Sequence, residues 1–166
     1  THLAQQILVD PEAEGMIVRH PTALEHLPSA IPLHRAALAS MRGDLAGAIR
    51  HASAARDAAL EDQPLERGAS GGVLALAHWV AGDLDAAHDT WATAVADLER
   101  AGHRADMLGG FLAMGEIRIT QGRLDDARRI FEQGAQLGMA DAGALRGTAD
   151  MLVGLAEVAL EQRDLV

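Results

Sequence analysis

Apolar residues recur along most of this chain at the three- and four-residue spacing of amphipathic helices. From residue 33 onward, Leu, Ala and a few larger apolar residues keep this spacing, and short polar or glycine-containing segments interrupt it. Such spacing places the apolar side chains on one face of a helix. The pattern predicts helices over residues 33–42, 45–60, 65–81, 84–100, 105–121, 124–137 and 144–162.

One short motif recurs between these helices. Glycine, then Asp or Arg, then Leu stand at 43–45, 82–84 and 122–124, and a fourth copy at 162–165 has Arg163 in the glycine's place. The steps between copies are 39, 40 and 41 residues. A fixed period in this range is typical of a solenoid, in which each repeat packs only on its neighbours.

Each copy predicts a tight turn between two antiparallel helices. The glycine suits the left-handed position that ends a helix, and Asp is a good N-cap for the next one. Small Ala87 lets two helices approach closely, while Trp91 and its equivalent Phe131 are predicted core residues. Ala52 takes this place in the first copy, so that layer should be thinner. The glycines inside the first helix of each pair predict backbone-to-backbone contacts between neighbouring helices.

The predicted fold class is therefore all-α. We expect a right-handed superhelix of about three and a half antiparallel helix pairs, with a period of about 40 residues. Residues 31–166 should form this helical repeat domain. Residues 1–30 should form an irregular N-terminal extension, because Pro11, Pro21, Pro28 and Pro32 restrict that stretch.

Composition narrows the classes of function. The fourteen basic residues are all Arg, and the net charge of −10 argues against nucleic-acid binding by this segment. The absence of Cys excludes disulfides, thiol chemistry and Cys-based zinc sites. No apolar run is long enough to span a membrane, and no signal peptide is visible, so a cytoplasmic bacterial protein is the expectation.

Longer segments carry a family resemblance. The copies resemble tetratricopeptide repeats (TPR), lengthened from the usual length of about 34 residues. From about residue 30 to the end, the chain resembles the repeat region of MalT-like, ATP-dependent regulators of the LuxR family. The segments that carry this resemblance, in order, are LHRAALA at 33–39, LERGA at 65–69, ALAHWVAGDL at 75–84, IRITQGRL at 117–124 and RGTADMLVGL at 146–155.

The resemblance implies a sensor module. In that family a nucleotide-binding switch domain precedes the repeats and a DNA-binding helix-turn-helix follows them. This sequence contains neither, and we expect it to be a piece of such a regulator. The repeats would bind an unknown small-molecule inducer or protein partner and transmit that signal to the switch domain, without a cofactor. The alternative is a free-standing TPR-like scaffold for protein–protein interaction.

The first helix of each pair should line the inner face of the solenoid. The TPR pattern places on that face Ser40, Leu76, Trp79, Leu112, Glu116, Ile119, Thr120, Asp150, Val153 and Glu157. The candidate ligand-binding residues are Trp79, Glu116, Ile119, Thr120, Asp150 and Glu157, with Trp79 and the two glutamates at the centre. In the alternative interpretation, Trp79 packs under the next helix pair and the glutamates are simply solvated.

Catalysis and metal binding have little support. His78 and His88 lie near Asp85 and Asp89, but no suitable nucleophile or metal ligand set accompanies them. His20, His26 and His34 are better explained as scattered surface residues than as zinc ligands. We therefore expect neither an enzyme nor a metal site.

The end of the chain suggests a self-association surface. The sequence stops just inside a helix pair, so the last helix should lack its cover. We expect the chain to form a homodimer through the apolar side of this helix, which comprises Leu152, Leu155, Val158 and Ala159.

Overall fold

The computed structural model describes residues 21–140 and 143–162, with side chains described from residue 24 onward. This part of the chain is helical and contains no strand. Its seven helices are α2 (Pro21–Met41), α3 (Leu45–Ala58), α4 (Pro64–Val80), α5 (Leu84–Arg100), α6 (Arg104–Thr120), α7 (Leu124–Met139) and α8 (Thr148–Glu161).

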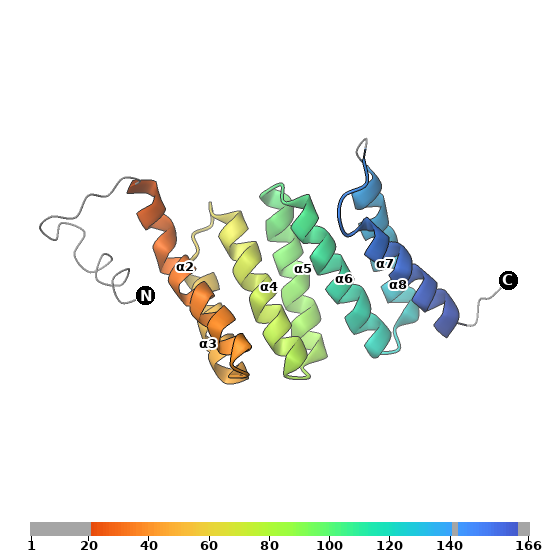
Figure 1. Cartoon of the computed structure of the whole chain (residues 1–166), viewed down its shortest axis with the longest axis horizontal. Helices are drawn as coiled ribbons and strands as arrows, with labels where there is room; N and C mark the ends of the chain where they lie inside the picture. The colour runs from red at the N-terminus through yellow and green to blue at the C-terminus, as the bar shows by residue number, and fades with distance from the viewer. Residues whose placement is uncertain (1–20, 141–142, 163–166) are drawn as a thin grey trace, which may run out of the picture.

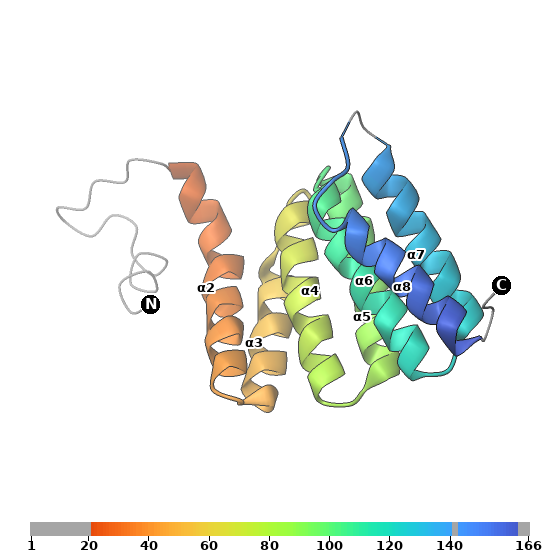
Figure 2. The same cartoon turned by 45° about the vertical axis from the view of Figure 1, so that its right-hand side comes forward.

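The helices stack as antiparallel pairs. Helices α2 and α3, α4 and α5, and α6 and α7 form three pairs, and α8 packs on α7 and α6. Figure 1 shows α2, α4, α6 and α8 as one layer, with α3, α5 and α7 behind it. Figure 2 shows the same succession of pairs from the side. The predicted all-α, TPR-like solenoid is confirmed.

The repeated glycines end helices as the motif predicts. Gly43, Gly82 and Gly122 have φ angles of 73°, 84° and 71°, in the left-handed region that favours glycine. At the α4–α5 turn, the amide of Gly82 donates to the carbonyl of Trp79 and the amide of Asp83 to that of His78, at 2.9 and 3.0 Å. These bonds satisfy carbonyl groups that the helix end would otherwise leave free.

Asp caps the next helix where the motif supplies it. The side chain of Asp44 accepts a hydrogen bond from the amide of Gly47, and that of Asp83 accepts one from Ala86. Arg123 stands at this position before α7 and gives no side-chain cap. The third turn therefore has the glycine and the backbone hydrogen bonds but no side-chain cap.

Helix α2 begins earlier than the sequence indicates. The prediction of irregular structure is wrong for residues 21–30, because α2 starts at Pro21 and contains Pro28 and Pro32. Pro21 suits the first turn of a helix, where its missing amide hydrogen costs nothing. Burial of Ser29 and Ile31 shows that this segment packs on the rest of the fold, and such packing overrides the local cost of proline. The remainder of the predicted extension lies outside the described residues.

Helix α8 begins later than predicted, at Thr148 instead of residue 144. Gly147 has a φ angle of 101°, which excludes it from the helix, and the Thr148 hydroxyl donates to the carbonyl of Leu145 at 2.7 Å. The amide of Leu145 in turn donates to Gly138 at the end of α7. These bonds hold residues 145–147 as a turn against α7.

Two aromatic residues form the centres of successive hydrophobic clusters. Trp91 is 8% exposed and packs among residues of α4, α5 and α6, while Phe131 is fully buried among residues of α6, α7 and α8. Both predictions of a core position are confirmed. The first layer, around Ala36, Ala52 and Leu74, is smaller, as expected from Ala52.

Each aromatic ring is seated between glycines. A Cβ on Gly115 or on Gly154 would overlap the ring of Phe131. A Cβ on Gly72 or Gly110 would lie 3.1 or 3.2 Å from ring atoms of Trp91. At these four glycines the prediction of backbone-to-backbone contact is wrong. The missing side chains make room for an aromatic ring, and at Gly110 first of all for the side chain of Val95. A Cβ on Gly71 would instead meet the side chain and backbone of Ala94 on α5, so close backbone approach holds there.

None of the described helices is long and apolar enough to cross a lipid bilayer.

Two glycine substitutions should change stability in opposite directions. We expect Gly154→Ala to lower the free energy of unfolding by about 1–3 kcal/mol, because the buried Phe131 ring cannot move away from the new methyl group. Gly109→Ala is the control, since its Cβ would meet nothing within 4 Å. It should raise stability by about 0.5–1 kcal/mol through helix propensity. Urea unfolding measures both, and a Gly154→Ala variant as stable as the parent would contradict the ring-seating role.

Candidate functional site

The structure places Trp79 at the edge of the core. Its side chain is partly buried and packs against the hydrophobic cluster around Trp91. This position agrees with the alternative in which Trp79 packs within the helix stack. Its role in recognition stays a prediction.

Glu116 and Glu157 are brought together by the packing of α6 and α8. Glu116 is partly buried and Glu157 is exposed. Partial burial, and after it the negative charge of Glu157, raises the pKa of Glu116 above its ordinary value. The two carboxylates therefore repel each other on the layer formed by the first helices.

The other candidate residues differ in their surroundings. Ile119 packs against the cluster around Phe131. Thr120 is exposed, and its hydroxyl donates to the carbonyl of Glu116 at 2.9 Å. Asp150 lies exposed in the first turn of α8. Of the six candidates, the structure shows an interaction between side-chain charges only for Glu116 and Glu157.

An apolar hollow of about 400 Å³ opens between α4 and α6. Helices α2 and α4 pack side by side, as do α6 and α8, whereas α4 and α6 are not in comparable contact. Trp91 and Leu98 of α5 therefore contribute to the lining of the hollow. The other lining residues are Gly68, Ala69, Gly72, Val73, Leu76, Ala105, Asp106 and Gly109.

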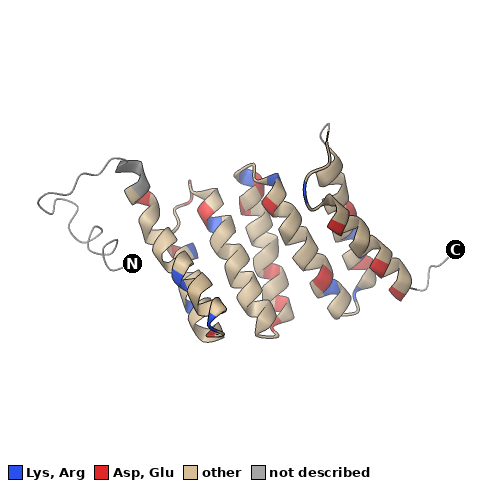
Figure 3. Cartoon of the chain, in the orientation of Figure 1, with Lys and Arg blue, Asp and Glu red and all other residues tan. Residues whose placement is uncertain are grey.

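A second apolar hollow of about 320 Å³ lies on the other side of α4, toward α2. Val73 and Leu76 line both hollows, so the two form one surface that crosses α4; we call it the inner groove. The remaining residues of the second hollow are Ala37, Ser40, Leu45, Ala77 and Val80. No Asp, Glu, Lys or Arg follows Arg67 within α4, and Figure 3 accordingly shows the rest of this helix in tan.

The sequence pattern found only part of this groove. Leu76 and Ser40 were expected on the inner face and do line it. Gly68, Gly72 and Gly109 were noted for helix packing, but not as the reason for a hollow. Glycines on two neighbouring first helices were the signal. Gly68 and Gly72 let Leu98 and Trp91 of α5 reach the floor of the hollow, and Gly109 faces open space.

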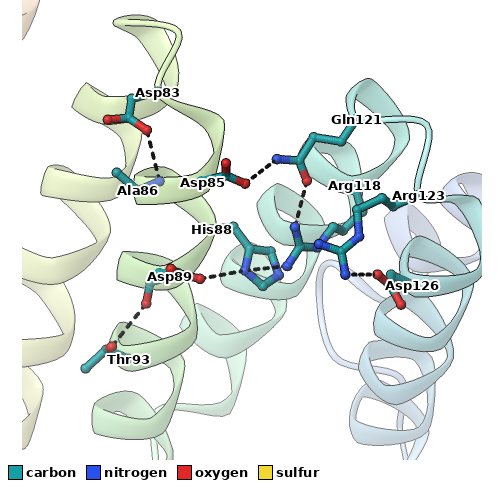
Figure 4. Close-up of polar contacts among 10 residues, drawn as sticks. All are labelled: Asp83, Asp85, Ala86, His88, Asp89, Thr93, Arg118, Gln121, Arg123 and Asp126. Atoms are coloured by element: carbon teal, nitrogen blue, oxygen red, sulfur yellow. Dashed lines mark hydrogen bonds and ion pairs between the residues drawn. The ribbon is translucent and has the colours of Figure 1, made fainter.

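A polar hollow of about 280 Å³ lies at the other layer, between α5 and α7. We call it the arginine hollow, and its lining residues are His88, Met114, Arg118, Arg123, Asp126, Arg129, Ile130 and Gln133. Figure 4 shows the polar contacts around it.

His88 and Arg118 connect α5 with α6 inside this polar cluster. The Arg118 guanidinium donates to Nδ1 of His88 at 3.0 Å and to Oε1 of Gln121 at 2.7 Å, and Gln121 donates to Asp85 at 2.9 Å. Because a guanidinium has only donors, Nδ1 of His88 must accept and the imidazole is neutral. Nδ1 of His88 then carries no proton, so it cannot donate a hydrogen bond to the Asp89 carboxylate 3.4 Å away.

A model of the family described as the MalT-like TPR region matches residues 30–166. The chain belongs to this family. No curated protein matches the chain.

Two histidines near the start of this MalT-like TPR region have separate partners. Nδ1 of His26 lies 2.8 Å from a carboxylate oxygen of Glu66, and Nδ1 of His34 lies 2.8 Å from the carbonyl oxygen of Ala30. Over the described residues, no group of three His, Asp or Glu side chains has the geometry of a metal site. His20 lies outside the described residues.

The last helix exposes only part of the predicted apolar set, since Leu152 is exposed as expected and Leu155 and Val158 are not. Val158 is fully buried and Leu155 packs with it against the Phe131 cluster, so the prediction that these two lack cover is wrong. Both side chains point to α6 and α7, which already cover that face. The large apolar residues that α8 exposes are Leu152, Val153 and Leu160.

Stability should fall on mild acidification because of His88. Burial, and after it the positive charge of Arg118, lowers the pKa of His88 below its ordinary value. The unfolded chain, with an ordinary histidine pKa of about 6.5, therefore takes up the proton first. The free energy of unfolding should drop as the pH falls below about 6.5, until the lowered pKa of the folded state is passed.

The His88→Gln variant tests this pH dependence, because glutamine keeps an acceptor for Arg118 but does not titrate. Urea unfolding of parent and variant at neutral and mildly acidic pH measures the difference. The variant should lose less stability than the parent on acidification. Equal losses in the two proteins would show that His88 does not titrate as the contact with Arg118 requires.

Proposed function

We propose that this MalT-like TPR region is the ligand- or partner-binding module of a bacterial LuxR-family transcriptional regulator. In this proposal the inner groove takes up a small-molecule inducer or an apolar segment of a protein partner. The signal passes to a nucleotide-binding switch domain outside this segment, and DNA binding belongs to a helix-turn-helix outside it. The module itself is neither catalytic nor DNA-binding, and it works in the cytoplasm.

The inner groove is the observation that carries the proposal. Its two hollows meet along α4, where Leu76 is 47% and Val80 is 70% exposed. Exposed apolar residues grouped in a concave surface are typical of ligand and partner sites, whereas scattered ones are not. The buried floor supports the proposal further, since Trp91 is held by packing and needs no rearrangement to receive a ligand.

The acidic candidates would give the groove its polar selectivity. Asp106 lies at the edge of the groove, and Glu116, Glu157 and Asp150 stand on the same layer of first helices. A ligand with an apolar body and several hydrogen-bond donors, or with a positive charge, fits this distribution. Trp79, Ile119 and Thr120 would act at the margin of that surface.

Signal transmission requires a difference in affinity. A ligand shifts a switch only if it binds the resting and self-associating states of the regulator with different free energies. Because the groove is formed by three successive pairs, a change in the angle between α4 and α6 would alter its width. Binding in the groove would therefore favour one curvature of the stack.

The alternative is a free-standing scaffold that binds a protein partner on the same groove. It shares the binding surface and lacks the coupling to a switch domain. A measurement of self-association in the full-length protein distinguishes the two proposals. Only a regulator should change its self-association when the groove is occupied.

A thermal-shift screen against sugars, nucleotides and short peptides tests the binding site. A groove ligand should raise the unfolding temperature, with a stabilisation of about 2.7 kcal/mol at a concentration 100 times its dissociation constant. The Leu76→Asn variant, altered in the groove, should lose this shift. Leu160→Asn is the control, because Leu160 is similarly exposed on α8 outside the groove.

The outcome decides among the proposals. A shift retained in Leu76→Asn places the ligand elsewhere and contradicts the groove. A ligand that needs Leu76 and also changes the self-association of the full-length regulator supports the sensor module. A silent screen, followed by capture of a defined partner that Leu76→Asn abolishes, supports the scaffold.

A further inference from the structure

The arginine hollow contains a buried charge that forms no ion pair with the described residues. Arg118 is 9% exposed, and both of its described hydrogen bonds go to neutral acceptors, His88 and Gln121. Among the described residues, no carboxylate lies within ion-pair distance of its guanidinium. Buried charges in proteins are usually paired, because desolvation of an isolated charge is costly.

Two further guanidinium groups share a single carboxylate at the rim. Arg123 and Arg129 each form an ion pair with Asp126, one with each carboxylate oxygen. A guanidinium has five N–H donors, and the described contacts of these two arginines engage only one donor each. Most of their donors are therefore available to a ligand.

The charge balance of the hollow is positive although the chain is acidic. Three arginines and one aspartate give a net charge of +2, since His88 is neutral, whereas the whole sequence carries −10. The hollow of about 280 Å³ is several times the volume of a water molecule, about 30 Å³. It therefore has room for a small anion beside Asp126.

We propose that the arginine hollow is a binding site for a small, doubly charged oxyanion of the phosphate class. Arg118 would supply the buried charge at the base, and Arg123 and Arg129 would donate from the rim. Planar guanidinium groups suit phosphate oxygens because they donate two parallel hydrogen bonds. The Gln133 amide, which also lines the hollow, adds a neutral donor.

Asp126 acts as an internal competitor in this site. Its carboxylate occupies donors of Arg123 and Arg129 that the anion would otherwise use. The arginines keep its pKa below the ordinary value, against the opposing effect of desolvation, so it stays charged at neutral pH. Bound phosphate must therefore share or displace these contacts, and removal of the Asp126 charge should strengthen binding.

Isothermal titration calorimetry with inorganic phosphate, at constant ionic strength and mildly alkaline pH, tests the site. We expect saturable binding to the parent and a loss of affinity of about tenfold or more in Arg129→Gln, through loss of one charge-assisted contact. Asp126→Asn should bind more tightly than the parent. Arg50→Gln is the control, because it removes one exposed positive charge on α3, away from the hollow.

Three results would overturn the proposal. The first is that phosphate does not bind the parent saturably, and the second is that Arg50→Gln and Arg129→Gln weaken phosphate binding equally. The third is that phosphate binds a folded Asp126→Asn variant more weakly than the parent. Equal weakening would mean that phosphate responds only to overall charge. Arg129 is 67% exposed, so its variant should keep the parent's circular dichroism and unfolding temperature.

Two further titrations define the ligand class. Acetate, a monoanion, should bind much more weakly than phosphate, and equal affinity would contradict a site for a doubly charged anion. Glycerol 3-phosphate distinguishes the source of the phosphoryl group. Tighter binding than inorganic phosphate assigns the site to a phosphorylated small molecule, and weaker binding assigns it to free phosphate.

Discussion

The seating of aromatic rings on glycines is the interaction on which the second and third layers of the stack depend. Trp91 lies against Gly72 and Gly110, and Phe131 lies against Gly115 and Gly154, so each ring joins three helices from two successive pairs. The Phe131 ring leaves no room for a side chain at Gly115 or Gly154, and the Trp91 ring leaves little at Gly72, because protein interiors are close-packed. In these two layers the rings therefore limit how closely the neighbouring helices approach.

The same small residues connect packing with binding. Gly68 and Gly72 on α4 and Gly109 on α6 line the inner groove together with the Trp91 ring. The other layer has the opposite character, since three arginines line its hollow between α5 and α7 and two of them share Asp126. This member of the MalT-like TPR region family thus has two chemically distinct surfaces, one apolar and one cationic.

Local features predicted the helices and turns well. Glycine followed by Asp or Arg and then Leu marked three of the turns, and helical spacing placed Trp91 and Phe131 in the core. The failures came where tertiary contacts outweigh local preference. Helix α2 continues through two prolines because its inner face packs on α3 and α4, and α8 starts late because residues 145–147 are bonded to the end of α7.

By itself the sequence determined the repeat, the all-α class and which residues are large or small. The helices depend on neighbours three to seven positions apart, and the repeat depends on copies of one motif 39–41 residues apart. Both patterns are present in the chain without knowledge of its fold. Only the tertiary structure decided that Gly72, Gly115 and Gly154 face aromatic rings and that Val73 and Leu76 line both apolar hollows. It also decided that Arg118 is buried without an ion pair among the described residues. Each of these depends on the distance between helices, which is set by side chains that lie on different helices.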